Sequence, residues 1–282
     1  MESNLTITEQ LMYSTIRIEC DLGGGAISTG TGFLFRFLEE NDKFIPAIVT
    51  NKHVVKGAVN GSFRFTLADD NGNPLNNKHE KFRFNNFENL WIMHPDPSVD
   101  LCIMPIAPIL TNAMNKGVNL FFISLDKSLI PSTEEINNLT AMEDIIMIGY
   151  PNGIWDSVNN LPILRRGVTA THPKIDYEGK QEFMIDAACF PGSSGSPVLL
   201  LNIGSFPMRD GGIAMGNRIK LLGALYAGPQ HTARGDIKIM NIPIRQEPVS
   251  ISRIPNNLGI VIKASKIMDF EEILRKIQQN NI

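Results

Sequence analysis

The sequence predicts an all-β protein that ends in a helix, on three observations. Most of the 282 residues fall into short extended segments separated by Gly, Asn and Pro, a pattern typical of barrels and sandwiches. Helical periodicity is weak before the C-terminus. The composition, 43% apolar and 20% charged, is that of a globular chain that can build a sizeable core. The length fits roughly two domains or one large all-β unit.

The first half of the chain contains a series of expected strands. They are Ser14–Cys20, Thr31–Phe37, Ala47–Thr50, Ser62–Leu67, Lys81–Phe84, Leu90–His94 and Leu101–Ile106. The run Asp70–Pro74 supplies turn residues between the fourth and the fifth strand, which indicates a hairpin with a protruding tip.

A crossover is expected from Pro105 to Lys116, where the pattern loses its alternation and collects prolines. We therefore expect an N-terminal unit over residues 1–115 and a second unit over residues 116–264. The strands expected in the second unit are Phe121–Leu125, Asp144–Gly149, Ile163–Ala170, Glu182–Asp186, Pro197–Leu201, Leu221–Ala227 and Gly259–Lys263. We interpret the stretch Pro229–Pro255 as an insertion that carries a hairpin.

The last segment, residues 265–282, changes to a helical period. Ser265 can cap a helix, and the charged residues that follow lie away from one apolar face. The apolar residues of that face recur at steps of three and four: Ile267, Phe270, Ile273 or Leu274, and Ile277. This pattern predicts a C-terminal helix packed against a barrel.

Charge and hydropathy narrow the classes of partner. A net charge of −3 and a pI near 6.0 provide no basic field that would hold nucleic acid by its phosphates. The N-terminus lacks the basic start and apolar core of a secretory signal, and no apolar run approaches the roughly 18 residues needed to span a bilayer. We expect a cytoplasmic protein that binds neither nucleic acid nor membranes.

The cysteines and histidines give no sign of a metal site. Cys20, Cys102 and Cys189 lie in apolar strand-like contexts without C-x-x-C spacing, so we expect them to pack as small hydrophobic residues in a reducing compartment. The histidines outside the candidate site have no metal-ligand spacing either. No metal is expected.

The string Pro191–Pro197 is the most informative part of the sequence. Its glycines allow a tight turn in which successive amide N–H groups converge on one point beside a serine hydroxyl, an arrangement that acyl transfer needs. Ser194 lies between Ser193 and Gly195 in this turn. A serine hydroxyl needs a base within hydrogen-bond reach, and the base needs a third group to orient it. The alternative is an ordinary Gly- and Ser-rich turn.

Two further residues supply the groups that such a serine needs. His53 follows the apolar run Ile48–Thr50 at a loop edge, and Asp100 precedes another apolar strand, where a carboxylate is costly unless it is hydrogen-bonded. Taken singly, each could be structural, as a capping histidine or an aspartate that closes a turn. Together, the chain order His53, Asp100, Ser194 matches one of the known orders of a catalytic triad.

In these and other motifs the sequence resembles the trypsin-like (chymotrypsin-fold) serine proteases. Its motifs are most similar to those of the bacterial HtrA/Deg branch. The motifs that carry the resemblance occur in the family's order from about residue 14 to 265. They are Gly30-Thr31-Gly32-Phe33, Thr50–Val55, Asp100-Leu101, Ile148–Pro151, Asp186–Ala188 and Gly192–Pro197, with Gly223 and the strand that leads to Gly228.

The resemblance implies a fold of two six-stranded antiparallel barrels with the active site between them, followed by the C-terminal helix. It implies that Ser194 attacks the peptide carbonyl, that His53 transfers the proton, and that Asp100 orients the imidazole. The amides of Gly192 and Ser194 would form the oxyanion hole. No cofactor is required, and the substrate would be a protein or peptide.

The resemblance also implies a substrate pocket without a carboxylate. Its lining would be Ala188, Cys189, Phe190, Tyr226, Ala227, Gly228 and Gly259. Such a pocket favours a small or medium apolar residue on the acyl side of the scissile bond. His231 leaves an alternative open, because it could receive an acidic side chain if the insertion folds over the pocket.

Departures from the family pattern limit what the resemblance implies. Val54 stands where secreted trypsins have a cysteine, and Ser193 stands where trypsin has the aspartate that pairs with a new N-terminus, so activation by that ion pair is not expected. Only residues 265–282 follow the protease region, whereas HtrA proteins usually carry a PDZ domain there. The alternatives are a catalytically silent binding module of this fold, and a defence or signalling effector protease regulated by a protein partner.

Overall fold

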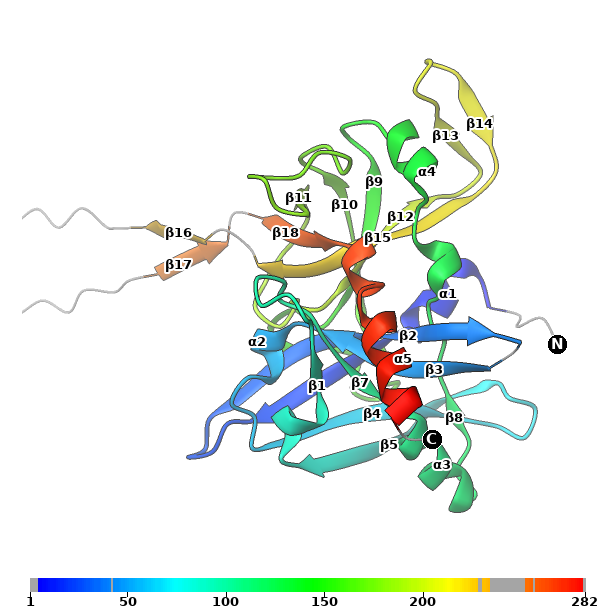
Figure 1. Ribbon diagram of the computed structural model, residues 1–282, viewed down its shortest axis with the longest axis vertical. Coiled ribbons are helices and arrows are strands. Elements are labelled where there is room, and N and C mark those ends of the chain that lie inside the picture. Colours follow the sequence, from blue (N-terminus) through cyan, green and yellow to red (C-terminus); the bar gives the residue numbers. More distant parts are fainter. Residues whose placement is uncertain (1–4, 42, 228–229, 234–251, 256, 281–282) are drawn as a thin grey trace, which may run out of the picture.

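The computed structural model describes residues 5–41, 43–227, 230–233, 252–255 and 257–280. Its two halves are an antiparallel sheet, which the view in Figure 1 shows below, and a closed barrel above it. The C-terminal helix α5 (Phe270–Asn280) runs in front of the strands of the sheet. The expected all-β fold with a C-terminal helix is confirmed.

The first half is an eight-stranded sheet with the order β5-β4-β1-β2-β3-β7-β6, and β8 also pairs with β4. This exceeds the six strands expected, because two two-residue strands are added: β6 at one edge, and β8 against one end of β4. The strands are β1 (Thr15–Asp21), β2 (Ile27–Glu40), β3 (Lys43–Thr50), β4 (Asn60–Ala68), β5 (Pro74–Asn85), β6 (Ile92–Met93), β7 (Cys102–Pro105) and β8 (Leu120–Phe121). The expected β4–β5 hairpin is confirmed, with Leu67 opposite Leu75.

The second half is a closed six-stranded barrel, as the family resemblance implies, and its strand order is β10-β11-β18-β15-β12-β9. Its strands are β9 (Asp144–Gly149), β10 (Ile163–Thr169), β11 (Glu182–Asp186), β12 (Pro197–Asn202), β15 (Arg218–Ala227) and β18 (Leu258–Lys263). The expected division at residue 115 stays a prediction, and β8, beyond that point, pairs with the first sheet.

Two short hairpins extend from the barrel. β13 (Ser205–Pro207) pairs with β14 (Ile213–Met215), and the sequence pattern did not predict it because its strands are only three residues long. β16 (Gln230–Ala233) pairs with β17 (Ser252–Pro255), which confirms a hairpin within the Pro229–Pro255 insertion. Residues 234–251 of the insertion lie outside the described residues.

Short helices connect the strands. They are α1 (Ile7–Met12), α2 (Lys52–Val55), α3 (Ala107–Asn115) and α4 (Thr133–Asn138). Helix α3 occupies the expected crossover. A proline in its first turn lacks only an N–H that has no intrahelical partner there, and Ile109 and Ala113 bury one face at a four-residue step. The prolines that suggested irregular chain therefore mark the start of a helix.

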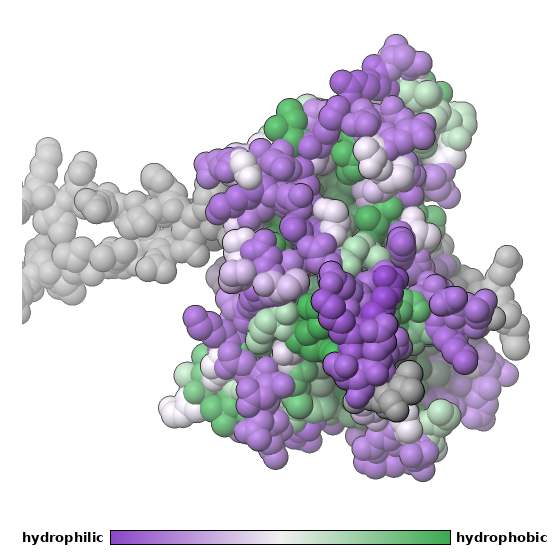
Figure 2. All heavy atoms as spheres, in the orientation of Figure 1, coloured by the Kyte–Doolittle hydropathy of each residue, from purple (hydrophilic) through white to green (hydrophobic). Residues whose placement is uncertain are grey.

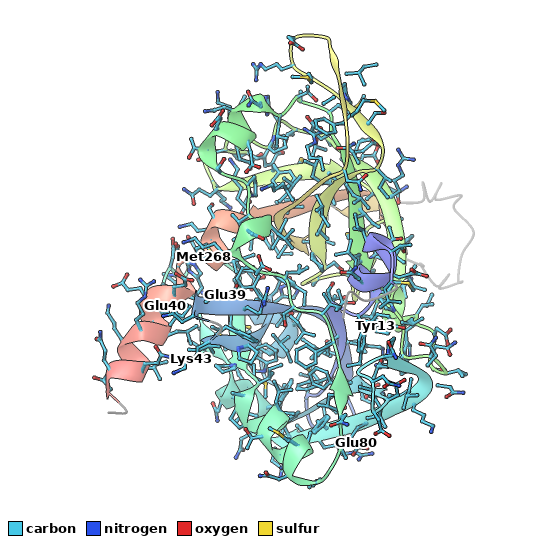
Figure 3. The ribbon with its side chains drawn as sticks, turned by 90° about the vertical axis from the view of Figure 1, so that its right-hand side faces the viewer. Tyr13, Glu39, Glu40, Lys43, Glu80 and Met268 are labelled. Carbon is cyan, nitrogen blue, oxygen red and sulfur yellow. The ribbon has the colours of Figure 1, made fainter. Side chains whose placement is uncertain are left out.

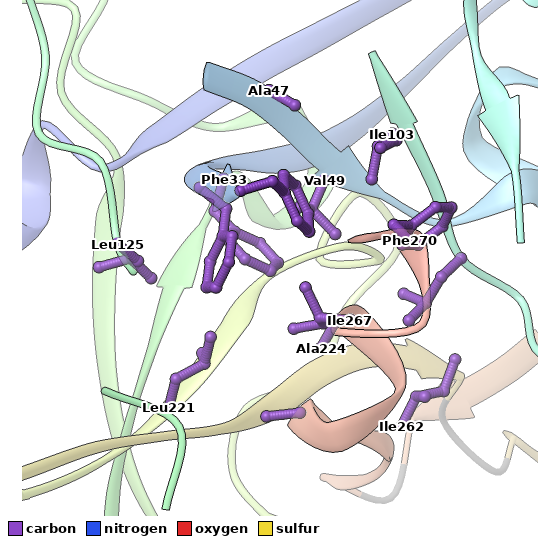
Figure 4. Close-up of a cluster of buried hydrophobic side chains, with 14 of the residues drawn as sticks. Phe33, Ala47, Val49, Ile103, Leu125, Leu221, Ala224, Ile262, Ile267 and Phe270 are labelled. Carbon is purple, nitrogen blue, oxygen red and sulfur yellow. The ribbon is translucent and has the colours of Figure 1, made fainter. Parts of the chain in front are cut away.

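The C-terminal segment packs against both halves of the molecule. A 3₁₀ turn, Ala264–Ile267, precedes α5, so Ser265 lies inside this turn and does not cap the helix. Ile267 and Phe270 belong to one buried cluster with Leu221 and Ala224 of the barrel and Val49 of the sheet (Figure 4). The helix thus seals the two halves rather than covering one barrel alone.

The outer face of α5 is hydrophilic, and apolar surface flanks it (Figure 2). The tip of the β2–β3 hairpin lies beside α5, and its charged residues Glu39, Glu40 and Lys43 are next to the helix (Figure 3). The backbone N–H of Leu38 donates to the Glu271 carboxylate at 3.2 Å. Ile277, expected on the buried face, is 40% exposed.

Within the described part of the chain, no helix combines the length and apolar character needed to cross a membrane.

Candidate active site

His53 and Asp100 lie together where β3 ends and the neighbouring strand β7 begins. Strand β3 ends at Thr50, and the short helix α2 then presents His53, whose Nδ1 lies 2.5 Å from Asp100 Oδ2. The backbone N–H of His53 donates to the other carboxylate oxygen at 3.1 Å. The ring is 46% exposed and the carboxylate 23% exposed, so the pair faces an accessible surface.

Neighbouring residues hold Asp100 in place and keep it ionised. Burial alone would raise its pKa, but hydrogen bonds from the His53 side chain and backbone, the His53 charge and the Lys52 backbone together lower the pKa below its usual value. The buried Asn51 donates from Nδ2 to the Asp100 carbonyl at 2.7 Å. Asp100 can therefore accept a hydrogen bond from the Nδ1–H of His53, which leaves Nε2 unprotonated and free to act as a base.

Ser194 sits in a tight turn that needs its glycines. Gly192 and Gly195 have φ values of 84° and 85°, a region that side chains with a Cβ rarely adopt. A Cβ on Gly195 would lie 1.9 Å from the Thr31 carbonyl oxygen, so this position also needs a close backbone approach. In the described residues, the amides of Gly192 and Ser194 donate to no protein acceptor. The turn therefore contains two backbone N–H groups that are free to donate to a bound group.

Thr31 of β2 joins the serine turn to the first sheet. Its N–H donates to the Ser194 carbonyl at 2.9 Å, and its hydroxyl donates to the Gly192 carbonyl at 2.9 Å. The Thr50 hydroxyl donates to the Thr31 carbonyl at 2.6 Å, three residues before His53. These bonds tie the turn to the strand end that carries the histidine.

The Ser194 hydroxyl donates to the Tyr226 carbonyl at 3.4 Å. Tyr226 itself lies near Asp100: burial and then the charges of Glu182, Asp100 and Glu178, with a hydrogen bond to Glu182, raise its pKa to about 12. The Ser194 hydroxyl thus contacts the end of β15, and the Asp100 charge acts on the Tyr226 side chain. Among the described residues, no hydrogen bond joins Ser194 to the His53 ring, a loose geometry common in sites without substrate.

The expected pocket residues are only partly open. Phe190 is 37% exposed and Tyr226 half-buried, whereas the buried Cys189 packs in the barrel core. A Cβ on Gly259 would lie 2.6 Å from both Cys189 Sγ and Leu225 Cδ1, so Gly259 allows close packing there rather than an empty space. Gly228 and the side chains of Ala227 and His231 lie outside the described residues.

All three cysteines, Cys20, Cys102 and Cys189, are free and buried, and burial raises the pKa of each thiol. They are therefore unreactive in the folded chain. Throughout the described residues, His, Cys, Asp and Glu side chains form no group of three that could hold a metal ion.

Three residues at the site were not assigned a role from the sequence: Thr31, Asn51 and Arg165. Thr31 and Asn51 belong to the motifs Gly30–Phe33 and Thr50–Val55. The motifs therefore mark these two residues, but they do not reveal the hydrogen bonds that the residues make. Arg165 of β10 donates from Nη1 to Ala188 and Ser193, and no local motif marks it.

The family model of the trypsin-like peptidase domain matches residues 30–205, which include His53, Asp100 and Ser194. A search of curated protein sequences finds no significant match to the chain.

Among solved structures, the chain is similar to the Rv3671c protease of Mycobacterium tuberculosis. The inactive form is 17% identical with a TM-score of 0.42, and the match covers 93% of this chain and 89% of that one. A Ser343Ala mutant in the inactive form is 16% identical with a TM-score of 0.41 and coverages of 95% and 88%. The active form is 16% identical with a TM-score of 0.39 and coverages of 91% and 78%.

Proposed function

The chain belongs to the trypsin-like peptidase domain family, and we propose that it is a serine endopeptidase that works through His53, Asp100 and Ser194. The observation that carries this proposal is the His53–Asp100 pair, hydrogen-bonded at 2.5 Å, beside a turn that presents Ser194 with two unused amide donors. Its substrate is a protein or peptide, and no cofactor takes part in the reaction.

The reaction proceeds through an acyl-enzyme. His53 Nε2 takes the hydroxyl proton as Ser194 Oγ attacks the peptide carbonyl carbon, and it then gives this proton to the leaving amine. Water, deprotonated by the same nitrogen, attacks the ester carbonyl; as the bond to Ser194 Oγ breaks, His53 Nε2 returns the proton to Oγ and the acid product leaves. The Ser194 hydroxyl leaves its weak 3.4 Å contact with Tyr226 to reach the imidazole.

The developing oxyanion is bound by the amides of Gly192 and Ser194. Because both amides lack a protein acceptor among the described residues, no protein hydrogen bond has to break when the oxyanion forms. Preorganised donors of this kind are among the largest contributions to catalysis, about 10²- to 10³-fold in rate for each donor removed. Thr31 keeps the turn in register by binding the carbonyls on both sides of this hole.

We expect a fluorophosphonate probe to label the purified wild-type protein on Ser194. The probe phosphonylates a serine that a base has activated beside an oxyanion hole: Oγ attacks phosphorus and fluoride leaves. Peptide mass spectrometry then places the adduct on Ser194, with Ser193 and Ser196 unmodified.

This labelling separates the proposed peptidase from the alternative of a silent binding module. The control is heat-denatured protein, which has lost the site and should not react. A folded wild-type protein that remains unlabelled would favour the binding module, and an adduct on Ser193 would contradict the assignment of the nucleophile. A partner-regulated effector protease would react faster once its protein partner is added.

We further expect cleavage after small or medium apolar residues such as Val, Ala, Leu and Met. The expected pocket residues offer no carboxylate, so a Lys or Arg side chain would be buried unpaired at a cost of several kcal/mol. The Arg165 guanidinium, bound to the Ala188 carbonyl at 2.9 Å, adds positive charge behind this pocket. Cleavage profiling of a denatured proteome measures the preference.

A dominant Lys or Arg preference in that profile would contradict the pocket assignment. A dominant Glu or Asp preference that is lost in His231→Ala would support the alternative in which the insertion supplies a base for acidic side chains.

A further inference from the structure

Arg165 lies directly beneath the turn that carries the oxyanion donors. Its Nη1 donates to the Ala188 carbonyl at 2.9 Å and to the Ser193 hydroxyl at 2.7 Å. The Ser193 hydroxyl also accepts from the Phe190 N–H at 3.4 Å, and the Ser193 N–H donates to the Phe190 carbonyl at 3.0 Å. One guanidinium nitrogen thus links the start of the segment 188–193 to its end.

The strand geometry directs Arg165 towards this segment. Successive strand residues point to opposite faces, so Arg166 points outward, with a side chain 80% exposed and paired with Asp144, while Arg165 points to the segment. Gly167, on the same face as Arg165, makes room for this approach, since a Cβ there would lie 2.2 Å from the Asp186 carbonyl oxygen. The strand β10 can therefore lie close against residues 186–188.

Burial of the Arg165 guanidinium destabilises the folded state. Within the described residues, its Nε and Nη2 are buried without a hydrogen-bond partner. Burial lowers the pKa of Arg165 to about 10, so the side chain still carries its charge at neutral pH. Unsatisfied buried donors are destabilising, which argues against a role in stability alone.

We propose that Arg165 is a positioning residue that holds the oxyanion turn in its productive conformation from inside the barrel. This inference rests on the proposed function. The Gly192 amide direction depends on the backbone between Ala188 and Ser193, and Gly192 itself has no Cβ to restrict it. By fixing both ends of this segment, the guanidinium limits the conformations in which the Gly192 amide points away from the substrate.

The other side of the turn is held from a different loop. The Asn152 N–H donates to the Pro191 carbonyl at 2.5 Å, in the loop that follows β9. The peptide that carries the Gly192 amide is thus bound from outside through Pro191 and from inside through Arg165 and the buried Ser193. The inner support comes from a side chain of this chain, so the turn is supported without a newly cut N-terminus.

The test measures fluorophosphonate inactivation of the full-length Arg165→Gln variant over a range of probe concentrations. Saturation separates the rate constant of bond formation, kinact, from the binding constant, KI. Loss of the support should lower kinact by about 10- to 100-fold, because an oxyanion donor is then misplaced in part of the population, and should leave KI within about threefold. Arg165→Lys, which keeps the charge but not the planar donor set, should be intermediate.

Arg166→Gln is the matched control, because it removes the neighbouring exposed guanidinium, and it should keep the wild-type kinact. Ser193→Ala removes the buried acceptor and leaves Arg165 intact; it should lower kinact while labelling still occurs on Ser194. If Arg165→Gln does not fold, as judged by circular dichroism, Ser193→Ala decides the question.

Wild-type kinact in a folded Arg165→Gln or Ser193→Ala variant would overturn the inference, as would a change in KI alone. Both results would leave the proposed function standing. A folded wild-type protein that is not labelled at all would overturn the proposed function, and this inference with it.

Discussion

Replacing Ser194 or His53 with alanine is expected to lower peptide turnover roughly 10⁶-fold, and Asp100→Ala about 10⁴-fold. The reason is that the three side chains act as one unit: without His53 the hydroxyl has no base, and without Asp100 the imidazole loses the 2.5 Å contact that fixes its tautomer. The two oxyanion amides remain in each variant. A residual rate of about 10³- to 10⁴-fold over water should therefore persist.

The double variants provide the sharper measurement. His53→Ala combined with Ser194→Ala should cost little more than either change alone, because the unit is already inactive. His79→Ala is the matched control, since His79 lies on β5 and its ring contacts the Ser157 carbonyl at 3.3 Å, away from the pair. Multiplicative losses in the double variant would show that the residues act independently, which a triad excludes.

The longer strands were predictable because their sequence signal is local, whereas the three-residue strands β13 and β14 were not predicted. Alternation of buried and exposed residues and the turn residues around each strand are properties of short stretches, and strands such as Glu182–Asp186 match the structure to the residue. Helix α3 was not predicted, because its prolines argue equally for a helix start and for irregular chain. Its tertiary contacts, through Ile109 and Ala113, decide between these two conformations.

The same division applies to the candidate site. His53, Asp100 and Ser194 each lie in a short motif that can be recognised in the sequence. For His53 and Asp100 it is a polar residue at the end of a strand, and for Ser194 it is the glycines that allow a positive φ. Thr31 and Arg165 act through partners far along the chain; the Thr31 hydroxyl binds a carbonyl 161 residues away. Pattern arguments within one segment contain no information about such contacts, so only the folded arrangement identifies them.

Phe270→Ala is expected to lower the free energy of unfolding by about 3–5 kcal/mol, the usual cost of truncating a buried phenylalanine. The Phe270 side chain is fully buried, and its ring centroid lies 6.3 Å from that of Phe37 and 5.2 Å from that of His94. Its loss opens a cavity in the cluster that joins the sheet, the barrel and the C-terminal segment. Denaturant unfolding followed by circular dichroism measures the change.

Ile277→Ala is the matched control for this prediction, because Ile277 lies on the same helix but is 40% exposed. It should cost less than about 1 kcal/mol, since little apolar area leaves the core. If the last helix covered the surface without sealing the two halves, both variants would be equally mild. If it seals them, Phe270→Ala should also slow Ser194 labelling near the unfolding midpoint, because His53 comes from the sheet and Ser194 from the barrel.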